Sequence, residues 1–360
     1  MINILSLSWS VDSSLGKEDL SRLVFCIILY FLIITTIREK KQLNSIINVL
    51  LFLAGLEILY SISQLFGFDP IVKNIYSVVW MRMMGTIGHH NFLSEYLMMI
   101  MPLMAGVYLT TTNKYKKVFT GLLFLLSILV AILTLTRGVL ISLIVVFILM
   151  SIYLLRKNRE HFRNQKRQIF LILSLSVILF LLINIFLILP SSIVSRVKIF
   201  SIAKDRLTQT LTLKSRSVQS RFIIWDSALK MIKEKPLLGW GIGTFKFHFL
   251  DYRKLIKDFP EEAENVHNEY LQVWVETGLL GLVMFILLVV FYFRECFLLL
   301  KQTKDFQGSM QIAAFMFSIT GVLIDSLINF PLRITPNAIT FWYILGVTIA
   351  SYSVYNNRIS

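Results

Sequence analysis

The chain has 360 residues, 56% of them hydrophobic, and its mean hydropathy is +0.70. A soluble domain of this length does not keep so apolar a surface in solution, so the composition excludes a soluble protein and predicts a polytopic membrane protein. The formal net charge of +15 needs no nucleic-acid partner, because Lys and Arg gather in loops that would face an anionic leaflet.

Apolar windows of about 20 residues, long enough to cross a hydrocarbon core as helices, recur along the chain. In order they cover Leu20–Ile37, Ser45–Phe66, Phe92–Thr110, Val118–Leu135, Gly138–Leu155, Gln168–Leu189, Gln272–Phe293, Ser309–Phe330 and Asn337–Tyr355. We therefore expect an all-α integral membrane bundle of about nine spans.

The loops between these windows differ sharply in positive charge, which favours the cytoplasmic side of a membrane. One set holds Arg38, Lys40, Lys41, Lys114, Lys116, Lys117, Arg156, Lys157, Arg159, Arg163, Lys166, Arg167, Arg294, Lys301 and Lys304. The opposite short loops hold only Lys73, Arg82, Arg137 and Arg333. This bias predicts an external amino terminus and an internal carboxyl terminus.

The windows divide the chain into three parts. Residues 1–189 hold the first six spans, residues 190–271 form a large external loop subdomain, and residues 272–360 hold the last three spans. Within the loop, Ser220–Glu234 is predicted to be an amphipathic helix suited to a membrane surface, followed by a Lys-Pro stop. Its apolar positions, three and four residues apart, are Phe222, Trp225, Leu229 and Ile232.

The glycines of LLGWGIGTF are spaced G-x-G-x-G, unlike the G-x-G-x-x-G dinucleotide pattern, and favour a tight turn over a phosphate cradle. The sequence has no Walker-type phosphate loop, no D-x-D pair and no zinc-like His/Cys spacing. We therefore expect neither ATP, nor a metal, nor another cofactor. Cys26 and Cys296 lie in or at spans and indicate neither a disulfide framework nor a redox site.

Cations and histidines gather on the predicted external side: Arg137 in TLTRGVL, Arg221 in QSRFIIW, His267 in VHNEYLQ, and His89-His90 in GTIGHHNFLSEY. The arginines have two interpretations, snorkelling to lipid phosphate or bidentate binding of a lipid-linked diphosphate. His267 is either an interfacial anchor or a general base; an imidazole suits the second role because its ordinary pKa lies near neutrality.

Taken in order, the stretches GTIGHHNFLSEYL, LTLTRGVLISL, RFIIWDSALKMIKEKPLLGWGIGTF and NVHNEYLQVWVETGLLGLVMF resemble the O-antigen ligase and O-antigen polymerase-like family over Met84–Phe293. The resemblance implies a glycosyltransferase of the bacterial inner membrane, with a periplasmic active face. It implies metal-free transfer of a glycan from undecaprenyl diphosphate to lipid A-core, a growing O-chain or another acceptor. Ligase and polymerase differ in acceptor, and the sequence leaves both open.

Residue by residue, Arg137 matches the arginine of the family's S-x-S-R-like motif, Arg221 that of its R-x-x-x-W helix, and His267 the histidine of H-N-x-Y-L-Q. The resemblance implies that the arginines hold the diphosphate and that the histidine serves the acceptor hydroxyl. Asn91 matches the second asparagine of G-x-F-G-N-P-N-x-L-A, whereas His89 and His90 replace asparagine and proline and receive no role. The candidate supporting residues are Asn91, Asn268, which is expected to cap the next span, and Glu276.

Acidic residues inside spans support a competing class, an ion-coupled lipid or glycan transporter. Of Glu57, Glu95, Glu276 and Asp325, only Glu57 is expected near a midplane, so we favour an enzyme. The enzyme would lose activity but keep diphosphate binding in His267→Ala, whereas a transporter would be more sensitive to Glu57→Gln.

Family members usually have about a dozen spans and an internal amino terminus. Nine spans with an external terminus therefore predict that Met1 is an internal start, rather than the natural start of a short member.

Overall fold

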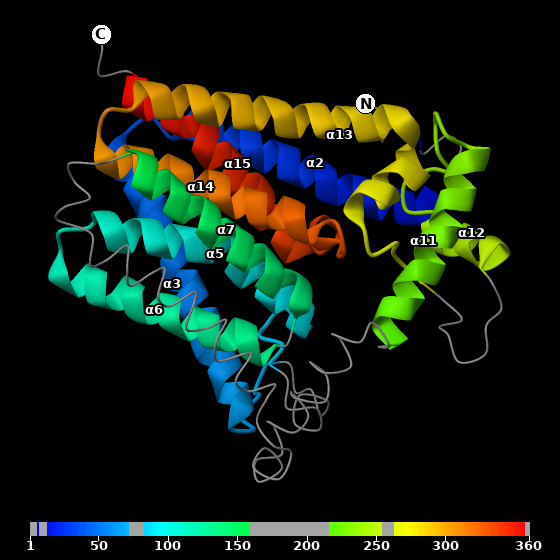
Figure 1. Ribbon diagram of the computed structural model, residues 1–360, viewed down its shortest axis with the longest axis horizontal. Coiled ribbons are helices and arrows are strands. Elements are labelled where there is room, and N and C mark those ends of the chain that lie inside the picture. The colour runs from blue at the N-terminus through cyan, green and yellow to red at the C-terminus, as the bar shows by residue number, and fades with distance from the viewer. Residues whose placement is uncertain are drawn as a thin grey trace. The chain divides into compact units, whose positions relative to one another are not determined.

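The computed structural model describes Ser6 and residues 13–71, 83–134, 136–157, 216–253 and 263–356. Within these ranges all regular elements are helical, which confirms the all-α prediction (Figure 1). Among the described residues, eight helices are long and apolar enough to cross a membrane. The chain is therefore a multi-pass membrane protein. The expected span Gln168–Leu189 lies outside the described residues.

The chain divides into two compact units. The first contains Met1–Leu23, Leu171–Leu288 and Ser326–Phe330, and the second contains Val24–Phe170, Val289–Asp325 and Pro331–Ser360. Helices α2 (Ser13–Thr36) and α13 (Glu269–Gln302) contribute residues to both. The three-part division expected from the sequence stays a prediction.

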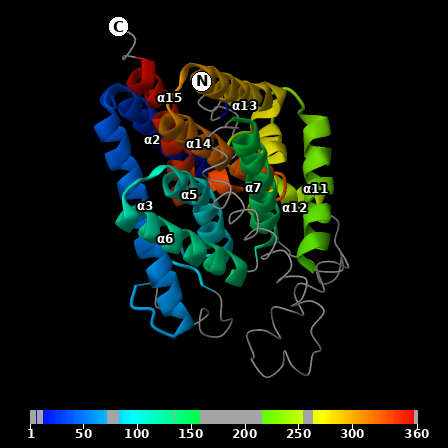
Figure 2. The ribbon, with the colours of Figure 1, turned by 60° about the vertical axis from the view of Figure 1, so that its left-hand side comes forward.

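The second unit is a bundle around two buried helices. These are α5 (His90–Thr110) and α14 (Phe306–Asp325), whose apolar windows are 83% and 78% buried. The two helices pack against each other, and small residues let them approach closely: a Cβ on Gly106 would lie 3.1 Å from the Ala314 Cβ. Around them lie α3 (Lys40–Leu65), α6 (Lys114–Leu133), α7 (Arg137–Lys157) and α15 (Thr335–Asn356) (Figure 2).

The first unit is built on α11 (Arg216–Glu234), α12 (Phe245–Tyr252) and the start of α13. The amphipathic helix predicted for this region is confirmed, and only part of its apolar face enters the core. Phe222 and Leu229 are 58% and 46% exposed, and the core is formed from neighbouring positions. It includes Ile224, Ala228, Met231, Ile232, Trp240, Phe245, Phe249, Val266 and Val275.

Two of the expected spans end far from the corresponding helix ends in the structure. Gln272–Phe293 is the middle of the longer α13, which breaks at Gly278, where φ is 70° and ψ is −173° (Figure 1). Ser309–Phe330 was too long, because α14 ends at Asp325. The next five residues, Ser326–Phe330, belong to the first unit, and we call them the α14 turn.

The tight turn expected at the G-x-G-x-G sequence is confirmed. Gly239, Gly241 and Gly243 all lie in the left-handed region, with φ of 70°, 109° and 74°. Such angles suit glycine and are unfavourable for residues that carry a Cβ.

Candidate active site

His267 lies just before α13 in a strained backbone conformation. Its φ is 56°, and among the described residues it is the sole non-glycine residue with a positive φ. Histidine is one of the residues that visit this region more readily, but the conformation still costs free energy and persists only where the surroundings impose it. Strain of this kind concentrates at functional sites.

The residues on either side of His267 are fixed by three hydrogen bonds. The Val266 N–H donates to Gln272 Oε1 at 2.6 Å, and the Val266 carbonyl accepts from Trp225 Nε1 at 3.0 Å. Asn268 Oδ1 accepts from the Leu271 N–H at 3.0 Å, which confirms the expected cap at the start of α13. Trp225 thus links α11 to Val266–Asn268, which we call the histidine segment.

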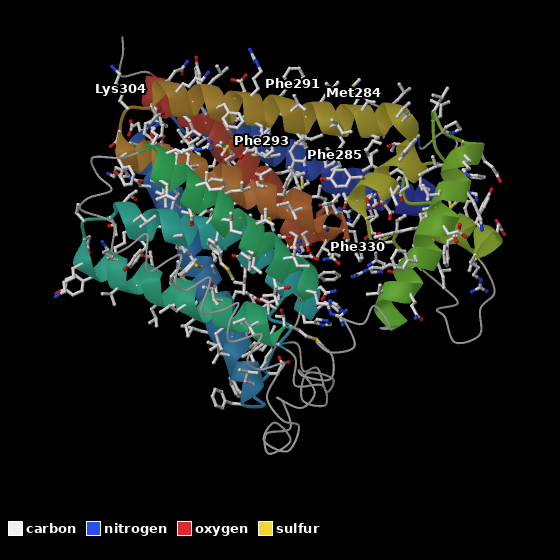
Figure 3. All side chains as sticks on the ribbon, in the orientation of Figure 1. Met284, Phe285, Phe291, Phe293, Lys304 and Phe330 are labelled. Atoms are coloured by element: carbon white, nitrogen blue, oxygen red, sulfur yellow. The ribbon has the colours of Figure 1, made fainter. Side chains whose placement is uncertain are left out.

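The α14 turn holds the same segment from a distant part of the chain. The Ser326 carbonyl accepts from the Glu269 N–H, and the Leu327 carbonyl accepts from Asn268 Nδ2, both at 2.9 Å. The Phe330 ring, labelled in Figure 3, meets the His267 imidazole edge to face, with ring centroids 4.8 Å apart. The imidazole therefore has one aromatic wall.

Arg221 contacts the same turn. Its Nη2 donates to Asn329 Oδ1 at 3.1 Å, and Asn329 is only 4% exposed. The guanidinium and the imidazole, 46 positions apart by their numbers in the sequence, are thus both held by the five residues of the α14 turn. Sequence reasoning missed this turn because it assigned these residues to a span; a polar Asn329 in the apolar run SLINF was the available signal.

Glu276 is buried on α13, one helical turn after Gln272. Gln272 Nε2 donates to Glu276 Oε1 at 2.8 Å. The side-chain oxygen of the same residue, Oε1, accepts from the Val266 N–H. Glu276 therefore orients the glutamine that fixes the histidine segment. This contact gives the predicted supporting residue a specific place in the first unit.

The candidates of the second unit meet at the start of α5 and α7. Thr136 Oγ1 donates to Asn91 Oδ1 at 3.1 Å, directly before Arg137 begins α7. His89 caps α5, since its Nδ1 accepts from the Asn91 N–H at 3.2 Å, and burial lowers the pKa of His89 below its usual value. That Arg137 acts together with Arg221 stays a prediction.

That Glu57 lies near a midplane stays a prediction, but the structure gives this residue a contact. Its carboxylate accepts from the Thr86 N–H at 2.8 Å and from Thr86 Oγ1 at 2.7 Å, so it holds the loop before α5. Glu95 accepts from Asn337 Nδ2 at 2.9 Å and joins α5 to α15. Both acids have structural contacts in the second unit.

The candidate site lies in a region of the chain that is similar to known proteins. Residues 122–286 match the family described as O-Antigen ligase, and this range includes Arg137, Arg221 and His267. The match and the relatives below confirm the resemblance predicted from the sequence motifs. The matched region is similar to O-antigen ligases.

Relatives from several bacteria align with parts of the chain. An "Uncharacterized protein" of Haemophilus influenzae is 29% identical over 191 residues, 50% of this chain and 45% of the relative. A protein of Rickettsia conorii named "Putative polysaccharide ligase" is 28% identical over 130 residues, 34% of this chain and 31% of its own. One of Rickettsia typhi with the same description is 34% identical over 86 residues, 22% and 20% of the two chains. The chain thus spans less than half the length of each relative.

Proposed function

We propose that the protein is a glycosyltransferase that moves a glycan from undecaprenyl diphosphate to an acceptor hydroxyl without a metal, as an O-antigen ligase does in surface polysaccharide assembly. The observation that carries the proposal is the α14 turn, which holds a guanidinium and a strained histidine through contacts at Asn329 and Phe330. The match to O-antigen ligases over the same residues supports it.

His267 is the proposed general base. An imidazole has a pKa near neutrality, so it can take the proton of an acceptor hydroxyl as that oxygen attacks the anomeric carbon. The new carbon–oxygen bond forms while the bond to the diphosphate breaks, and the diphosphate departs with its electron pair. The left-handed backbone at His267 and the Phe330 ring fix the direction of the imidazole.

Arg221 and Arg137 are the proposed diphosphate ligands. A leaving diphosphate gains negative charge, and fixed cations stabilise it in the transition state. A guanidinium offers two parallel N–H donors to phosphate oxygens, which an ammonium does not. Asn329 orients one end of the Arg221 guanidinium through a hydrogen bond to Nη2.

The active face is proposed to be the periplasmic side of the inner membrane, and the acceptor is lipid A-core. An O-antigen polymerase would share this donor chemistry and use a second carrier-linked glycan as acceptor. The transporter alternative loses its main support, because Glu57 holds the Thr86 loop. A coupling ion that bound the Glu57 carboxylate would have to displace its hydrogen bonds from Thr86.

The test is glycan transfer from a synthetic polyprenyl-diphosphate glycan in membranes that contain the protein, with EDTA present throughout. Lipid A-core and a second carrier-linked glycan are offered together. We expect transfer in EDTA to lipid A-core; transfer to the second glycan would identify a polymerase. Activity that requires an added divalent cation would overturn the metal-free chemistry, and no transfer to either acceptor would overturn the proposed function.

A further inference from the structure

The break in α13 leaves backbone groups without partners inside the helix. Gly278 adopts a non-helical conformation, which removes the regular hydrogen bonds across Val275, Glu276 and Leu279. Orphaned backbone groups of this kind must find other partners when they are shielded from water.

The loop after α11 supplies those partners. The Trp240 N–H donates to the Val275 carbonyl and the Gly241 N–H to the Glu276 carbonyl, both at 2.8 Å. The Leu279 N–H donates to the Pro236 carbonyl, also at 2.8 Å. Loop and helix break therefore form one hydrogen-bonded unit.

The two backbones are in direct contact, because glycine occupies both sides. A Cβ on Gly278 would lie 2.1 Å from the Leu237 carbonyl oxygen, and one on Gly239 would lie 2.6 Å from the Glu276 carbonyl. No other residue type allows this approach. The loop Lys235–Gly239, which we call the leucine loop, is therefore at the same height along α13 as Gly278.

The uncharged run of α13 indicates that this height lies within the hydrocarbon core. Residues 277–293 of α13 carry no charge, and they are flanked by Glu276 and Arg294. At about 1.5 Å per residue this run spans about 25 Å, less than the roughly 30 Å of a bilayer core. A run this short would use its whole length to cross the core, which would place Gly278 and Leu279 inside it. The Trp274 indole, which donates to the Pro236 carbonyl at 3.1 Å, marks the interface.

The side chains of the leucine loop continue the lipid-facing surface of α13. Leu237 and Leu238 are 59% and 53% exposed. On α13, Leu280 is 49% exposed and Met284 is 57% exposed; Figure 3 shows Met284 pointing away from its helix. Lys233 and Lys235 are also exposed and suit the phosphates of the headgroup layer.

We propose that the leucine loop is a re-entrant membrane loop, with Leu237 and Leu238 in contact with the acyl chains of the leaflet next to the start of α13. Irregular backbone is tolerated at this depth only where its polar groups are satisfied, and α13 satisfies them. The loop directly follows α11, which carries Arg221, and it is hydrogen-bonded to α13, which begins just after His267. It thus fixes the height of the first unit against the membrane surface.

The test places a bimane fluorophore on Leu237→Cys or Leu238→Cys in the full chain, with the buried Cys26 and Cys296 replaced by alanine. Proteoliposomes contain either ordinary or dibrominated phosphatidylcholine, and iodide is the aqueous quencher. Val283→Cys, 42% exposed on α13, is the lipid control, and Asp251→Cys, exposed on α12, is the water control. This readout does not depend on glycan transfer.

We expect brominated lipid to quench Leu237 and Leu238 about as strongly as Val283, and at least about twofold more than Asp251. Iodide should quench the fluorophore at the Asp251 position and leave the fluorophores at the Leu237 and Leu238 positions unquenched. Iodide quenching of the leucines equal to that of Asp251 would overturn the proposal, because the loop would lie in water. Protection from both quenchers would also overturn it, because a protein surface rather than lipid would cover the loop.

Discussion

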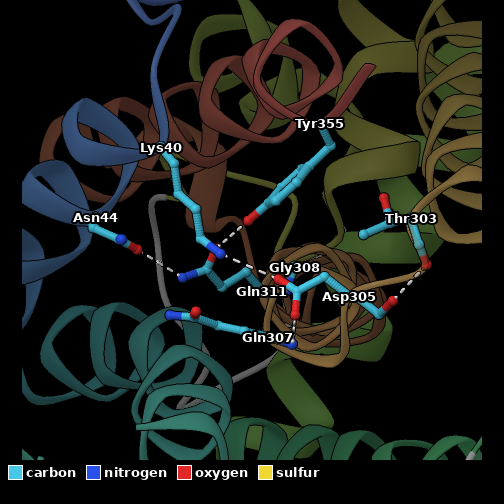
Figure 4. Close-up of polar contacts among 9 residues, drawn as sticks. Lys40, Asn44, Thr303, Asp305, Gln307, Gly308, Gln311 and Tyr355 are labelled. Carbon is cyan, nitrogen blue, oxygen red and sulfur yellow. Dashed lines mark hydrogen bonds and ion pairs between the residues drawn. The ribbon is translucent and has the colours of Figure 1, made fainter. Parts of the chain in front are cut away.

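Two polar clusters join distant parts of the chain, and they differ in how their residues are held. The first, which we call the Asp305 cluster, lies in the second unit (Figure 4). Asp305 accepts from Lys40 Nζ at 3.2 Å and from the Gly308 N–H at 3.1 Å, so it caps α14. Gln311 donates to Asn44 at 2.9 Å and accepts from Tyr355 at 2.6 Å.

The candidate active site has the same kind of long-range contacts but adds backbone strain. His267 is left-handed, and α13 is broken nine positions after its start. The Asp305 cluster needs neither, because caps and side-chain pairs of ordinary geometry satisfy it. Polar contacts of ordinary geometry, as in the Asp305 cluster, stabilise the fold. Contacts that hold a residue in a strained conformation indicate a site where geometry matters for chemistry.

The largest expected effect is on stability at the break in α13. Gly278→Ala adds a Cβ 2.1 Å from the Leu237 carbonyl oxygen at a positive φ, so we expect a loss of more than about 3 kcal/mol. Gly67→Ala is the matched control, since Gly67 also has a positive φ but nothing within 4 Å of its Cβ position. Thermal unfolding in detergent measures both; equal shifts would show that strain alone, and not the leucine loop, is responsible.

The next effect concerns the guanidinium of the site. Arg221→Lys keeps the charge and loses the bidentate geometry and the Asn329 contact. We expect the KM for the donor to rise about 10- to 100-fold, the equivalent of about 1.5–3 kcal/mol. Arg253→Lys, a partly buried arginine just after α12, should leave KM unchanged. An unaltered donor KM in Arg221→Lys would show that the residue only anchors to lipid.

A smaller effect separates positioning from general stability. Asn329→Ala removes one hydrogen bond to Arg221, worth about 1 kcal/mol, so the donor KM should rise about fivefold. The acceptor KM should not change, because Asn329 acts through the diphosphate ligand. Asn44→Ala, which removes a comparable bond from the Asp305 cluster, should change neither KM. Equal changes in both KM values for Asn329→Ala would mean that the variant only loosens the fold.

The smallest expected effect is on the pH dependence of stability, to which the Asp305 cluster contributes. Burial opposes ionisation of Asp305, but the Lys40 ammonium and the Gly308 N–H outweigh it and lower the pKa below its usual value. The carboxylate therefore stabilises the folded state above the ordinary Asp pKa, and this contribution is lost as pH falls below about 4. Asp305→Asn should flatten the acid limb of thermal stability by less than about 1 kcal/mol. An acid limb identical to wild type would show that the cap contributes nothing.

The sequence was sufficient for the parts of the structure that depend on local pattern. Apolar windows predict the described spans, the H-N dipeptide predicts the cap at Asn268, and the glycine spacing predicts the turn at Gly239. The sequence does not show which apolar positions of α11 enter the core, because apolar residues surround much of the helix and only tertiary packing decides between them.

The α14 turn was beyond sequence reasoning for a different physical reason. Asn329 and Phe330 follow an apolar helix and extend its pattern, so nothing local shows that they leave it. Their partners, Arg221 and His267, are far away in the sequence, and periodicity does not report such contacts. The strain at His267 likewise comes from tertiary contacts on both sides of it.

The most direct test of the account compares two histidines of the first unit in the transfer assay. His267→Asn keeps a residue that tolerates a left-handed backbone and removes the imidazole. His248→Asn removes a half-buried imidazole whose ring centroid lies 4.3 Å from that of Trp240. Burial and the Lys235 charge lower the pKa of His248. Both variants therefore lose an imidazole from the same unit.

The rate of glycan transfer should fall at least about 100-fold in His267→Asn and stay within about threefold of wild type in His248→Asn. Near-wild-type transfer by His267→Asn would contradict the central claim that this strained histidine is the base of the reaction.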